Sequence, residues 1–298
     1  MLSFEENEKN MGHRHRVVAE ALKGVLPEDR IELAVKGFDL VGDVAVIKIH
    51  KPLEADRFLI ANALRNHLPH VKTVLRQVGA VEGDFRTRKL EWLCGEKKTV
   101  ASHREHGCVF EVDLAKTYFS PRLLHERTRI SELCRNSTKH ENIVNMFSGV
   151  GCFSIRIAKQ PGKRHVYSVD LNPDAIKYQL RNIRSNRVRG TVTAILGESK
   201  QVIESFFQKR LQRIVMPLPE KSYLYLKSAA AAIGQEGGTI HYYDFTYAHK
   251  NENPIQKIIQ KVTQKLKAQP RCFSIEYGRV VRSTGPNWYQ VALDITLK

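Results

Sequence analysis

The chain has 298 residues, which fits one large domain or two modest ones. Its residues are 42% hydrophobic and 27% charged, close to globular averages, so a fibrous or wholly disordered chain is excluded. A formal net charge of +17 is higher than expected for an ordinary enzyme of small neutral substrates. It indicates a polyanionic partner, with nucleic acid as the first candidate.

The N-terminal segment and the cysteines favour a cytoplasmic protein. The first ten residues, MLSFEENEKN, lack the apolar region of a secretory signal, and no run approaches the roughly 18 apolar residues of a membrane span. Five cysteines are widely spread without a CxxC pair, which favours a reducing compartment. Cys94, His103, His106 and Cys108 lack the spacing of a known zinc site, so no metal is expected.

The first part of the chain is expected to be a small α+β domain over residues 13–112, after a flexible tail at residues 1–12. A short helix is expected from His13 to Leu26, since Pro27 would end it. Apolar residues at helical spacing predict a second helix at EADRFLIANALRNHL. Strands are expected at IELAVKGF, VGDVAVIKIH, VKTVLRQVG, RKLEWLCG and CVFEVDL.

Strands and helices alternate over residues 113–298, which predicts a parallel sheet with helices on both faces. The strands are IVNMF, HVYSVDL, TVTAILG, RIVMPLP and TIHYYDF, each followed by a helical segment. Two last strands, CFSIEYGRVVR and WYQVALDITL, are joined only by STGPN, too short for a parallel crossover, so they should form an antiparallel hairpin. This pattern resembles the seven-stranded methyltransferase fold that uses S-adenosylmethionine.

The charge excess lies almost entirely in the second part. Residues 1–112 carry a net charge of +1 and residues 113–298 carry +16. Such a field favours a phosphate backbone and predicts salt-sensitive binding. Two clusters are candidates for RNA contact: Arg181, Arg184, Arg187 and Arg189 near one helix end, and Lys257, Lys261 and Lys265 along another helix. A solvated helix face is the alternative for the lysines.

The first turn after a parallel strand has a pattern suited to a nucleoside. Gly149 and Gly151 allow the backbone to approach a ligand without a Cβ in the way. Asp170, at the end of the second strand, suits a carboxylate that binds ribose hydroxyls. Glu198, after the third strand, can face an adenine amino group. A plain turn and helix caps are the alternative for each residue alone, but the ordered set resembles an S-adenosylmethionine site.

Five segments together resemble the tRNA guanine-37 N1-methyltransferases of archaea and eukaryotes. They are GDFRTRKLEWLCGEKKT, VDLAKTYFSPRLLHERTRI, NMFSGVGCFSI, SVDLNPDA and IVMPLP, and the resemblance runs from about Gly42 to the C-terminus. It implies an α/β protein whose class I, Rossmann-like methyltransferase domain follows a small α+β domain. S-adenosylmethionine would be the cofactor, and the tRNA anticodon stem-loop the substrate of a cytoplasmic, monomeric enzyme.

The resemblance also implies site residues. Glu126 corresponds to the general base, Arg86 to the arginine that stabilises the base O6, and Tyr118 to a wall of the active site. Pro217 takes the place of an asparagine in an Asn-Leu-Pro motif that grips the target base. The cofactor-binding set implied by the resemblance is Phe119, Arg122, Phe147, Gly149, Gly151, Asp170, Asn172 and Glu198.

These residue types suit the chemistry. Guanine N1 becomes a nucleophile once its proton leaves, and the negative charge then develops on O6. A carboxylate such as Glu126 can accept the proton, and a guanidinium such as Arg86 can stabilise the oxyanion. The base must leave its stack, and Tyr118 is the aromatic residue expected to receive it. Surface ion pairing of Glu126 with Arg127 or Arg129 is the structural alternative.

Three positions depart from the family pattern: Asn145, Cys152 and Pro217. Pro217 resembles an archaeal subgroup that also methylates carbon 7 of 4-demethylwyosine in phenylalanine tRNA, so guanosine N1, the C7 position or both are open as targets. Two alternatives remain. One is the aminocarboxypropyl transfer of the wybutosine pathway, and the other is a non-catalytic RNA-binding protein on a methyltransferase scaffold.

Overall fold

The computed structural model describes residues 16–34, 38–135, 137, 139–267 and 269–298. The predicted tail at residues 1–12 and the first residues of the predicted helix from His13 lie outside this part, while residues 16–22 are helical. The chain divides into two compact units, Met1–Leu124 and His125–Lys298. The boundary predicted after residue 112 falls within unit 1, inside its last strand.

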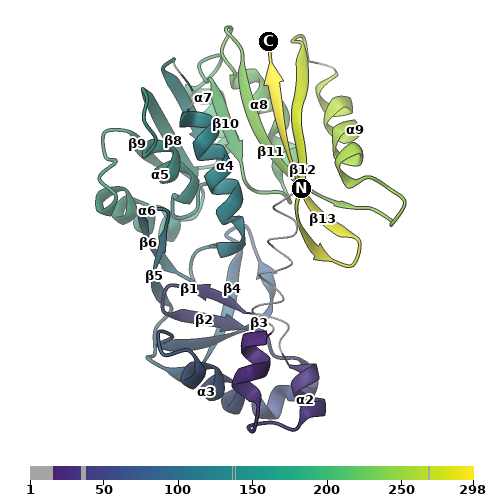
Figure 1. The fold of residues 1–298 in the computed structure, drawn as a ribbon. Helices are drawn as coiled ribbons and strands as arrows, with labels where there is room; N and C mark the ends of the chain where they lie inside the picture. The colour runs from purple at the N-terminus through teal and green to yellow at the C-terminus, as the bar shows by residue number, and fades with distance from the viewer. Residues whose placement is uncertain (1–15, 35–37, 136, 138, 268) are drawn as a thin grey trace. The chain divides into compact units, whose positions relative to one another are not determined.

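Unit 1 is built on a four-stranded sheet whose order is β1-β2-β3-β4 (Figure 1). The pairing of β2 with β3 is parallel and the other two pairings are antiparallel. The helix α3 buries Ile60, Ala61 and Leu64 in the core of the unit, the face that its apolar spacing predicts. The elements are β1 (Asp39–Val41), β2 (Val44–Ile47), α3 (Arg57–His67), β3 (Thr73–Glu82) and β4 (Thr87–Gly95).

One strand prediction for unit 1 is wrong, and a second, VGDVAVIKIH, is right only for β2 (Val44–Ile47). IELAVKGF was expected as a strand, but its first three residues belong to helix α2 (Glu28–Leu33). Pro27 precedes this helix and Glu28 and Asp29 occupy its first turn, where acidic side chains are stabilised by the helix dipole. VGDVAVIKIH is likewise not one strand. Gly42, at a φ of 58°, turns the chain between β1 and β2.

A two-stranded hairpin completes unit 1. It pairs β5 (Val100–Glu105), which the strand predictions omitted, with β6 (Cys108–Asp113), which they included. Its turn residues His106 and Gly107 have φ values of 44° and 75°, as a two-residue turn that matches the strand twist requires. The strand β5 was missed because its sequence, VASHRE, has few apolar residues.

Unit 2 is a seven-stranded sheet in the order β12-β13-β11-β10-β7-β8-β9. The pairings from β11 to β9 are parallel, and β13 runs antiparallel to both β11 and β12. The predicted fold class and C-terminal hairpin are therefore confirmed. The strands are β7 (Glu141–Asn145), β8 (Arg164–Asp170), β9 (Val192–Leu196), β10 (Arg213–Met216), β11 (Gly238–Tyr247), β12 (Phe273–Gly285) and β13 (Trp288–Leu297).

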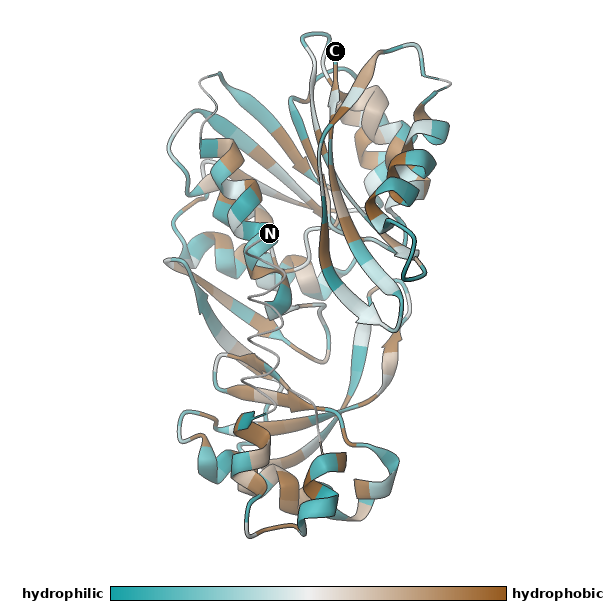
Figure 2. Ribbon diagram, turned by 45° about the vertical axis from the view of Figure 1, so that its right-hand side comes forward, coloured by the Kyte–Doolittle hydropathy of each residue, from teal (hydrophilic) through white to brown (hydrophobic). Residues whose placement is uncertain are grey.

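Helices cover this sheet, and hydrophobic residues line its strands (Figure 2). Helices α5 and α6 pack on β8, whereas α8 and α9 pack on β11. None of the helices in the described part of the chain is long and apolar enough to cross a membrane. The helices of unit 2 are α4 (Leu124–Arg135, beginning at the unit boundary), α5 (Cys152–Ala158), α6 (Pro173–Ser185), α7 (Ser199–Phe206), α8 (Ser222–Ala232) and α9 (Pro254–Leu266).

Candidate active site

The turn between β7 and α5 joins the predicted cofactor residues. Gly149 and Gly151 have φ values of 54° and 90°, which glycine adopts without strain. A Cβ on Gly151 would lie 2.9 Å from Cγ of Gln179, so a larger residue does not fit. The Oδ2 atom of Asp170 accepts a hydrogen bond from the backbone N–H of Gly149 at 2.6 Å. The strand end and the glycine turn are thereby held together.

Asp170 is a carboxylate held by backbone donors. Its Oδ1 atom accepts a hydrogen bond from the backbone N–H of Asn172 at 2.9 Å. Burial raises the pKa of Asp170, and the hydrogen bonds from Asn172, Gly149 and Leu171 oppose that rise. Because a carboxylate has about four lone-pair positions, the two oxygens can still accept hydrogen bonds from a ligand.

A buried network of neutral polar side chains supports the glycine turn. Asn145, one of the departures from the family pattern, donates from Nδ2 to Oγ of Ser154 at 3.0 Å, and that oxygen lies 2.6 Å from Oγ of Ser168. Gln179 donates to Oγ of Ser168, and Asn182 donates to the carbonyl of Val150 at 3.0 Å. Sequence reasoning missed these partners because they lie on separate strands and helices.

Asn172 and Glu198 both cap helices. Oδ1 of Asn172 accepts from the N–H of Asp174 at 2.9 Å, and Oε2 of Glu198 accepts from the N–H of Gln201 at 2.9 Å. Beside them, Leu171 and Leu196 are 45% and 56% exposed. Sequence reasoning overlooked these leucines, whose signal is an apolar residue at the end of a parallel strand. Together these residues offer two helix-capping polar side chains, the Asn172 amide and the Glu198 carboxylate, beside the apolar surface of Leu171 and Leu196.

Pro217 directly follows β10. The carbonyl oxygens on either side of it are occupied. Oγ of Ser222 lies 2.9 Å from the Met216 oxygen and 2.8 Å from the Leu218 oxygen. Within the described residues the Pro217 carbonyl accepts no hydrogen bond. Phe147 is half-buried and meets Tyr225 edge to face at 5.0 Å between ring centroids.

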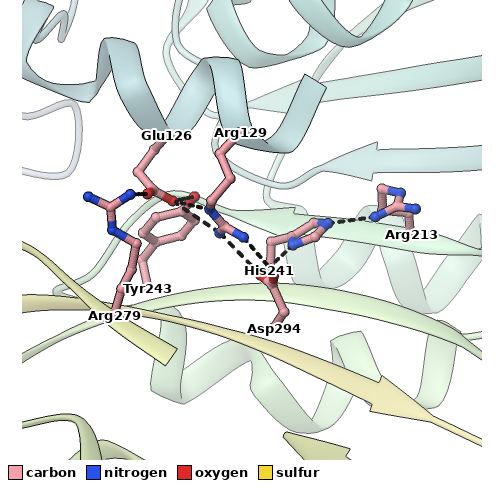
Figure 3. Close-up of polar contacts among 7 residues, drawn as sticks. All are labelled: Glu126, Arg129, Arg213, His241, Tyr243, Arg279 and Asp294. Atoms are coloured by element: carbon pink, nitrogen blue, oxygen red, sulfur yellow. Dashed lines mark hydrogen bonds and ion pairs between the residues drawn. The ribbon is translucent and has the colours of Figure 1, made fainter. Parts of the chain in front are cut away.

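Glu126, the predicted general base, is buried on α4 with 1% of its surface exposed. Its Oε2 atom accepts hydrogen bonds from Nε and Nη2 of Arg129, both at 3.1 Å, and from the hydroxyl of Tyr243 at 2.7 Å (Figure 3). Nη1 of Arg279 lies 3.3 Å from Oε1. The pairing of Glu126 with Arg129 is therefore buried, not a surface contact.

The ion pairing continues beneath Glu126. Arg129 also binds Asp294 of β13, with Nη1 2.5 Å from Oδ2 and Nη2 3.2 Å from Oδ1. Oδ1 of Asp294 lies 2.7 Å from Nδ1 of His241, and Nη1 of Arg213 lies 2.8 Å from Nε2 of that histidine. Sequence reasoning missed these ion pairs because the residues come from α4 and three different strands, β10, β11 and β13.

The other predicted residues lie in unit 1. The guanidinium of Arg86 stacks on the ring of Tyr118, with 3.9 Å between Cζ and the ring centroid. Nε of Arg122 donates to Oδ1 of Asp39 at 3.0 Å. Phe119 is 3% exposed and meets the ring of His103 edge to face. Arg86 and Tyr118 are thus brought together, and Phe119 packs in the core of unit 1.

The two basic clusters differ. Arg184, Arg187 and Arg189 are exposed at the end of α6. Along α9, Lys257 pairs with Glu252 at 2.9 Å, and Lys261 pairs with the buried Asp244 at 2.7 Å. The lysines therefore have part of their charge balanced within unit 2.

Comparison with known proteins places these features in a family. Residues 101–271 match the model of the TRM5/TYW2 methyltransferase domain, and residues 18–99 match that of the TYW2 N-terminal domain. The tRNA (guanine(37)-N(1))-methyltransferase Trm5b of Pyrococcus abyssi is 34% identical over 90% of this chain and 77% of its own length. Its crystal structure has a TM-score of 0.79, at 32% identity, and covers 92% of this chain and 78% of that one.

Two further relatives differ in their named activity. The tRNA 4-demethylwyosine(37)-methyltransferase Taw21 of Saccharolobus solfataricus is 33% identical over 87% of this chain and 93% of its own length. A TYW2 of P. horikoshii, solved in complex with MeSAdo, has a TM-score of 0.75 at 26% identity and covers 95% of this chain and 98% of its own. The chain therefore belongs to the TRM5/TYW2 methyltransferase family, which confirms the predicted family and the predicted class of S-adenosylmethionine-dependent enzyme.

Proposed function

We propose that this protein methylates the purine at tRNA position 37, at guanosine N1, at carbon 7 of 4-demethylwyosine, or at both. The observation that carries the proposal is the buried Glu126, whose hydrogen bonds within the described part of the chain fall on Oε2 and leave Oε1 as an acceptor. A buried carboxylate whose Oε1 has an ion-pair partner but accepts no hydrogen bond among the described residues is suited to accept a proton from a base that has left its stack.

The residues present fit S-adenosylmethionine. The closely packed Gly151 provides a backbone surface without a side chain, and the Asp170 carboxylate is an acceptor for the ribose hydroxyl side of the cofactor. Glu198 with the exposed Leu171 and Leu196 suits an adenine ring, which has a polar edge and apolar faces. When bound, the cofactor supplies a methyl group on a positively charged sulfur, so the transfer requires no metal.

For guanosine, one residue of this chain would accept the proton and another would stabilise the negative charge. Glu126 accepts the N1 proton, and general-base help of this kind is worth about 10²–10⁴-fold in rate. Arg86 stabilises the negative charge that develops on O6. The stacking of Arg86 on Tyr118 holds the guanidinium plane in one orientation, which reduces the cost of ordering it when the base arrives.

Pro217 supports activity on the tricyclic base. Proline has no backbone N–H and no side-chain amide to read the Watson–Crick edge of guanine, while its carbonyl is an unused acceptor. The relative named as a 4-demethylwyosine methyltransferase matches this chain over 93% of its own length. We further propose that the substrate is phenylalanine tRNA, contacted at its anticodon stem-loop, and that the enzyme is cytoplasmic and monomeric.

One observation favours a second activity, the transfer of an aminocarboxypropyl group from the same cofactor. It is the match of residues 18–99 to the TYW2 N-terminal domain. That reaction breaks a different carbon–sulfur bond and leaves methylthioadenosine as the by-product, whereas methyl transfer leaves S-adenosylhomocysteine. The two by-products therefore separate the two activities.

The test uses the purified protein with cofactor and two phenylalanine tRNAs, one with unmodified guanosine and one with 4-demethylwyosine at position 37. Digestion and mass spectrometry identify the modified nucleoside and the by-product. A gain of one methyl group at position 37 with release of S-adenosylhomocysteine supports the proposal. Release of methylthioadenosine selects the second activity, and tRNA binding without any modified nucleoside indicates a non-catalytic protein.

A further inference from the structure

The two oxygens of Glu126 have different surroundings. Oε2 receives three hydrogen bonds, two from Arg129 and one from Tyr243 (Figure 3). Oε1 is buried and has no hydrogen-bond partner in the described residues, and Nη1 of Arg279 stands 3.3 Å away as an ion-pair partner. Oε2 therefore anchors the carboxylate, and Oε1 is the oxygen with capacity for a proton.

Arg129 is shared between two carboxylates. Nε and Nη2 donate to Glu126, while Nη1 and Nη2 donate to Asp294. The ring of Tyr277 lies 4.6 Å from its Cζ atom. Because one guanidinium charge serves two acids, Glu126 is less fully neutralised by Arg129 than it would be in an isolated pair. Asp294 therefore weakens the electrostatic stabilisation that Arg129 gives to the Glu126 carboxylate.

Asp294 is in turn fixed by His241. Arginine can only donate, so Nε2 of His241 accepts from Arg213, and the ring proton must sit on Nδ1, where it donates to Asp294. Burial lowers the pKa of His241, which agrees with this neutral tautomer. Burial opposes the ionisation of Asp294, but the hydrogen bonds from His241 and Arg129 outweigh it and lower the pKa of Asp294 to about 2.

Tyr243 acts on Glu126 in the opposite sense. It is 1% exposed, and its hydroxyl donates to Oε2. Burial, together with the charge of Glu126, holds the pKa of Tyr243 well above its usual value, so the hydroxyl stays a donor at every working pH. A donor to a carboxylate stabilises its ionised form and makes it a weaker base.

We propose that Asp294 and Tyr243 are positioning residues that tune the basicity of Glu126 in opposite directions and present Oε1 as the proton-accepting oxygen. This rests on the proposed function, in which Glu126 is the base. The charged and titratable groups around Glu126 are Arg129 on α4, Tyr243 on β11, Arg279 on β12 and, through Arg129, Asp294 on β13. Asp294 strengthens the base and Tyr243 weakens it.

The experiment is the pH profile of single-turnover methylation, with cofactor and tRNA saturating. Tyr243→Phe removes a donor from Oε2, so the acidic limb should move to higher pH. Asp294→Asn removes a negative charge and gives Arg129 to Glu126 alone. Its acidic limb should move to lower pH, and its plateau should fall by about 10-fold. Cofactor and tRNA affinities should change little in either variant.

Matched controls lie on the same strand as Tyr243. The Tyr242 hydroxyl donates to Asp244 at 2.5 Å, and Asp244 pairs with Lys261, away from Glu126. Tyr242→Phe and Asp244→Asn should therefore leave the position of the acidic limb unchanged. A thermal melt of each variant separates loss of folding from loss of rate. If Asp294→Asn does not fold, Tyr243→Phe alone is the test, and an acidic limb at the wild-type pH then overturns the assignment.

Opposite shifts in the two variants support the assignment, and unshifted limbs or shifts in one direction overturn it. If Glu126 is not the base, the result is different, because Glu126→Gln would then methylate at the wild-type rate. Wild-type protein that modifies neither tRNA would refute the proposed function and this assignment with it.

Discussion

Asp170 and Gly149 are joined by a hydrogen bond of 2.6 Å from the glycine N–H to the Oδ2 atom, across 21 residues of sequence. Asp170→Ala removes both this link and the acceptor for the ribose hydroxyls. S-adenosylmethionine affinity measured by calorimetry should fall by about 3 kcal/mol, or about 100-fold, the worth of two hydrogen bonds to a charged group. Asp174→Ala, in the first turn of α6, is the control. Equal affinity in wild type and Asp170→Ala would contradict the cofactor assignment.

The buried setting of Asp170 predicts a pH dependence for cofactor binding. Burial raises the pKa of this carboxyl, and a protonated carboxyl accepts fewer hydrogen bonds than a carboxylate. Affinity should therefore be greatest at neutral pH and fall on acidification, with the fall beginning at a higher pH than for an ordinary aspartate. Calorimetry across a pH series measures this. Asp170→Asn, which cannot ionise, should bind weakly with no such dependence, and a wild-type affinity that stays constant would refute the prediction.

Glu126→Gln keeps the shape of the side chain and removes its ability to take a proton. The single-turnover rate of N1 methylation should fall about 10²-fold or more, and cofactor and tRNA binding should persist. The variant also removes the Glu126 charge that faces Arg129 and Arg279, while Arg129 keeps its ion pair with Asp294. The free energy of unfolding should therefore fall, but by less than the roughly 3–5 kcal/mol of breaking an isolated buried pair. Glu132→Gln, exposed on the same helix, is the control for both measurements. A rate within a few-fold of wild type would remove Glu126 as the base.

Binding of tRNA should depend steeply on salt, and the two basic clusters should contribute unequally. Arg184→Gln with Arg187→Asn removes two exposed charges, so the slope of log affinity against log salt should fall by about 2. Asparagine suits position 187 because Arg187 has a φ of 59°. The pair Lys257→Gln and Lys261→Gln removes equal charge from residues already paired with acids, and it should change the slope less. An equal change in both pairs would contradict this ranking.

The fold of unit 2 could be predicted from sequence because local patterns carry it. Each buried strand is a short apolar run, and the predicted link STGPN is too short for anything but a hairpin. In the structure the link is shorter still, residues 286–287, because β12 extends to Gly285. Unit 1 was harder, since the segment after Pro27 has the apolar content of a strand and the capping acids of a helix. There the acids at the helix start decided the outcome.

The candidate site also has one part that the sequence predicts and another part that it does not. Asp170 and the two glycines lie where strand ends place them, so their spacing was informative. The surroundings of Glu126 were not predictable, because Tyr243 and Asp294 lie 117 and 165 residues from the α4 residues they contact. Sheet register places the strand residues side by side: Tyr243 lies on β11 next to β13, and His241 is the direct cross-strand partner of Asp294.

Pro217 is the position where product choice is expected to be set. An asparagine there can orient the N1–H and amino group of guanine through its side-chain amide, whereas proline offers a rigid apolar wall without an amide. The tricyclic base is bulkier, has lost the guanine Watson–Crick pattern and reacts at a carbon. We therefore expect methylation at C7 of 4-demethylwyosine, with N1 methylation of guanosine retained or weaker.

Pro217→Asn should shift the balance toward guanosine by reducing the C7 reaction more than the N1 reaction. The measurement is the ratio of single-turnover rates on the two phenylalanine tRNAs, with products identified by mass spectrometry. Pro217→Ala is the matched variant, since it removes the ring without adding an amide. If the asparagine amide reads the guanine edge, only Pro217→Asn gains relative rate on guanosine. If the proline ring fits the tricycle, both variants lose relative rate on 4-demethylwyosine. Wild-type protein that methylates guanosine fully and never modifies the tricycle, at any enzyme excess, would show that Pro217 does not mark a C7 methyltransferase.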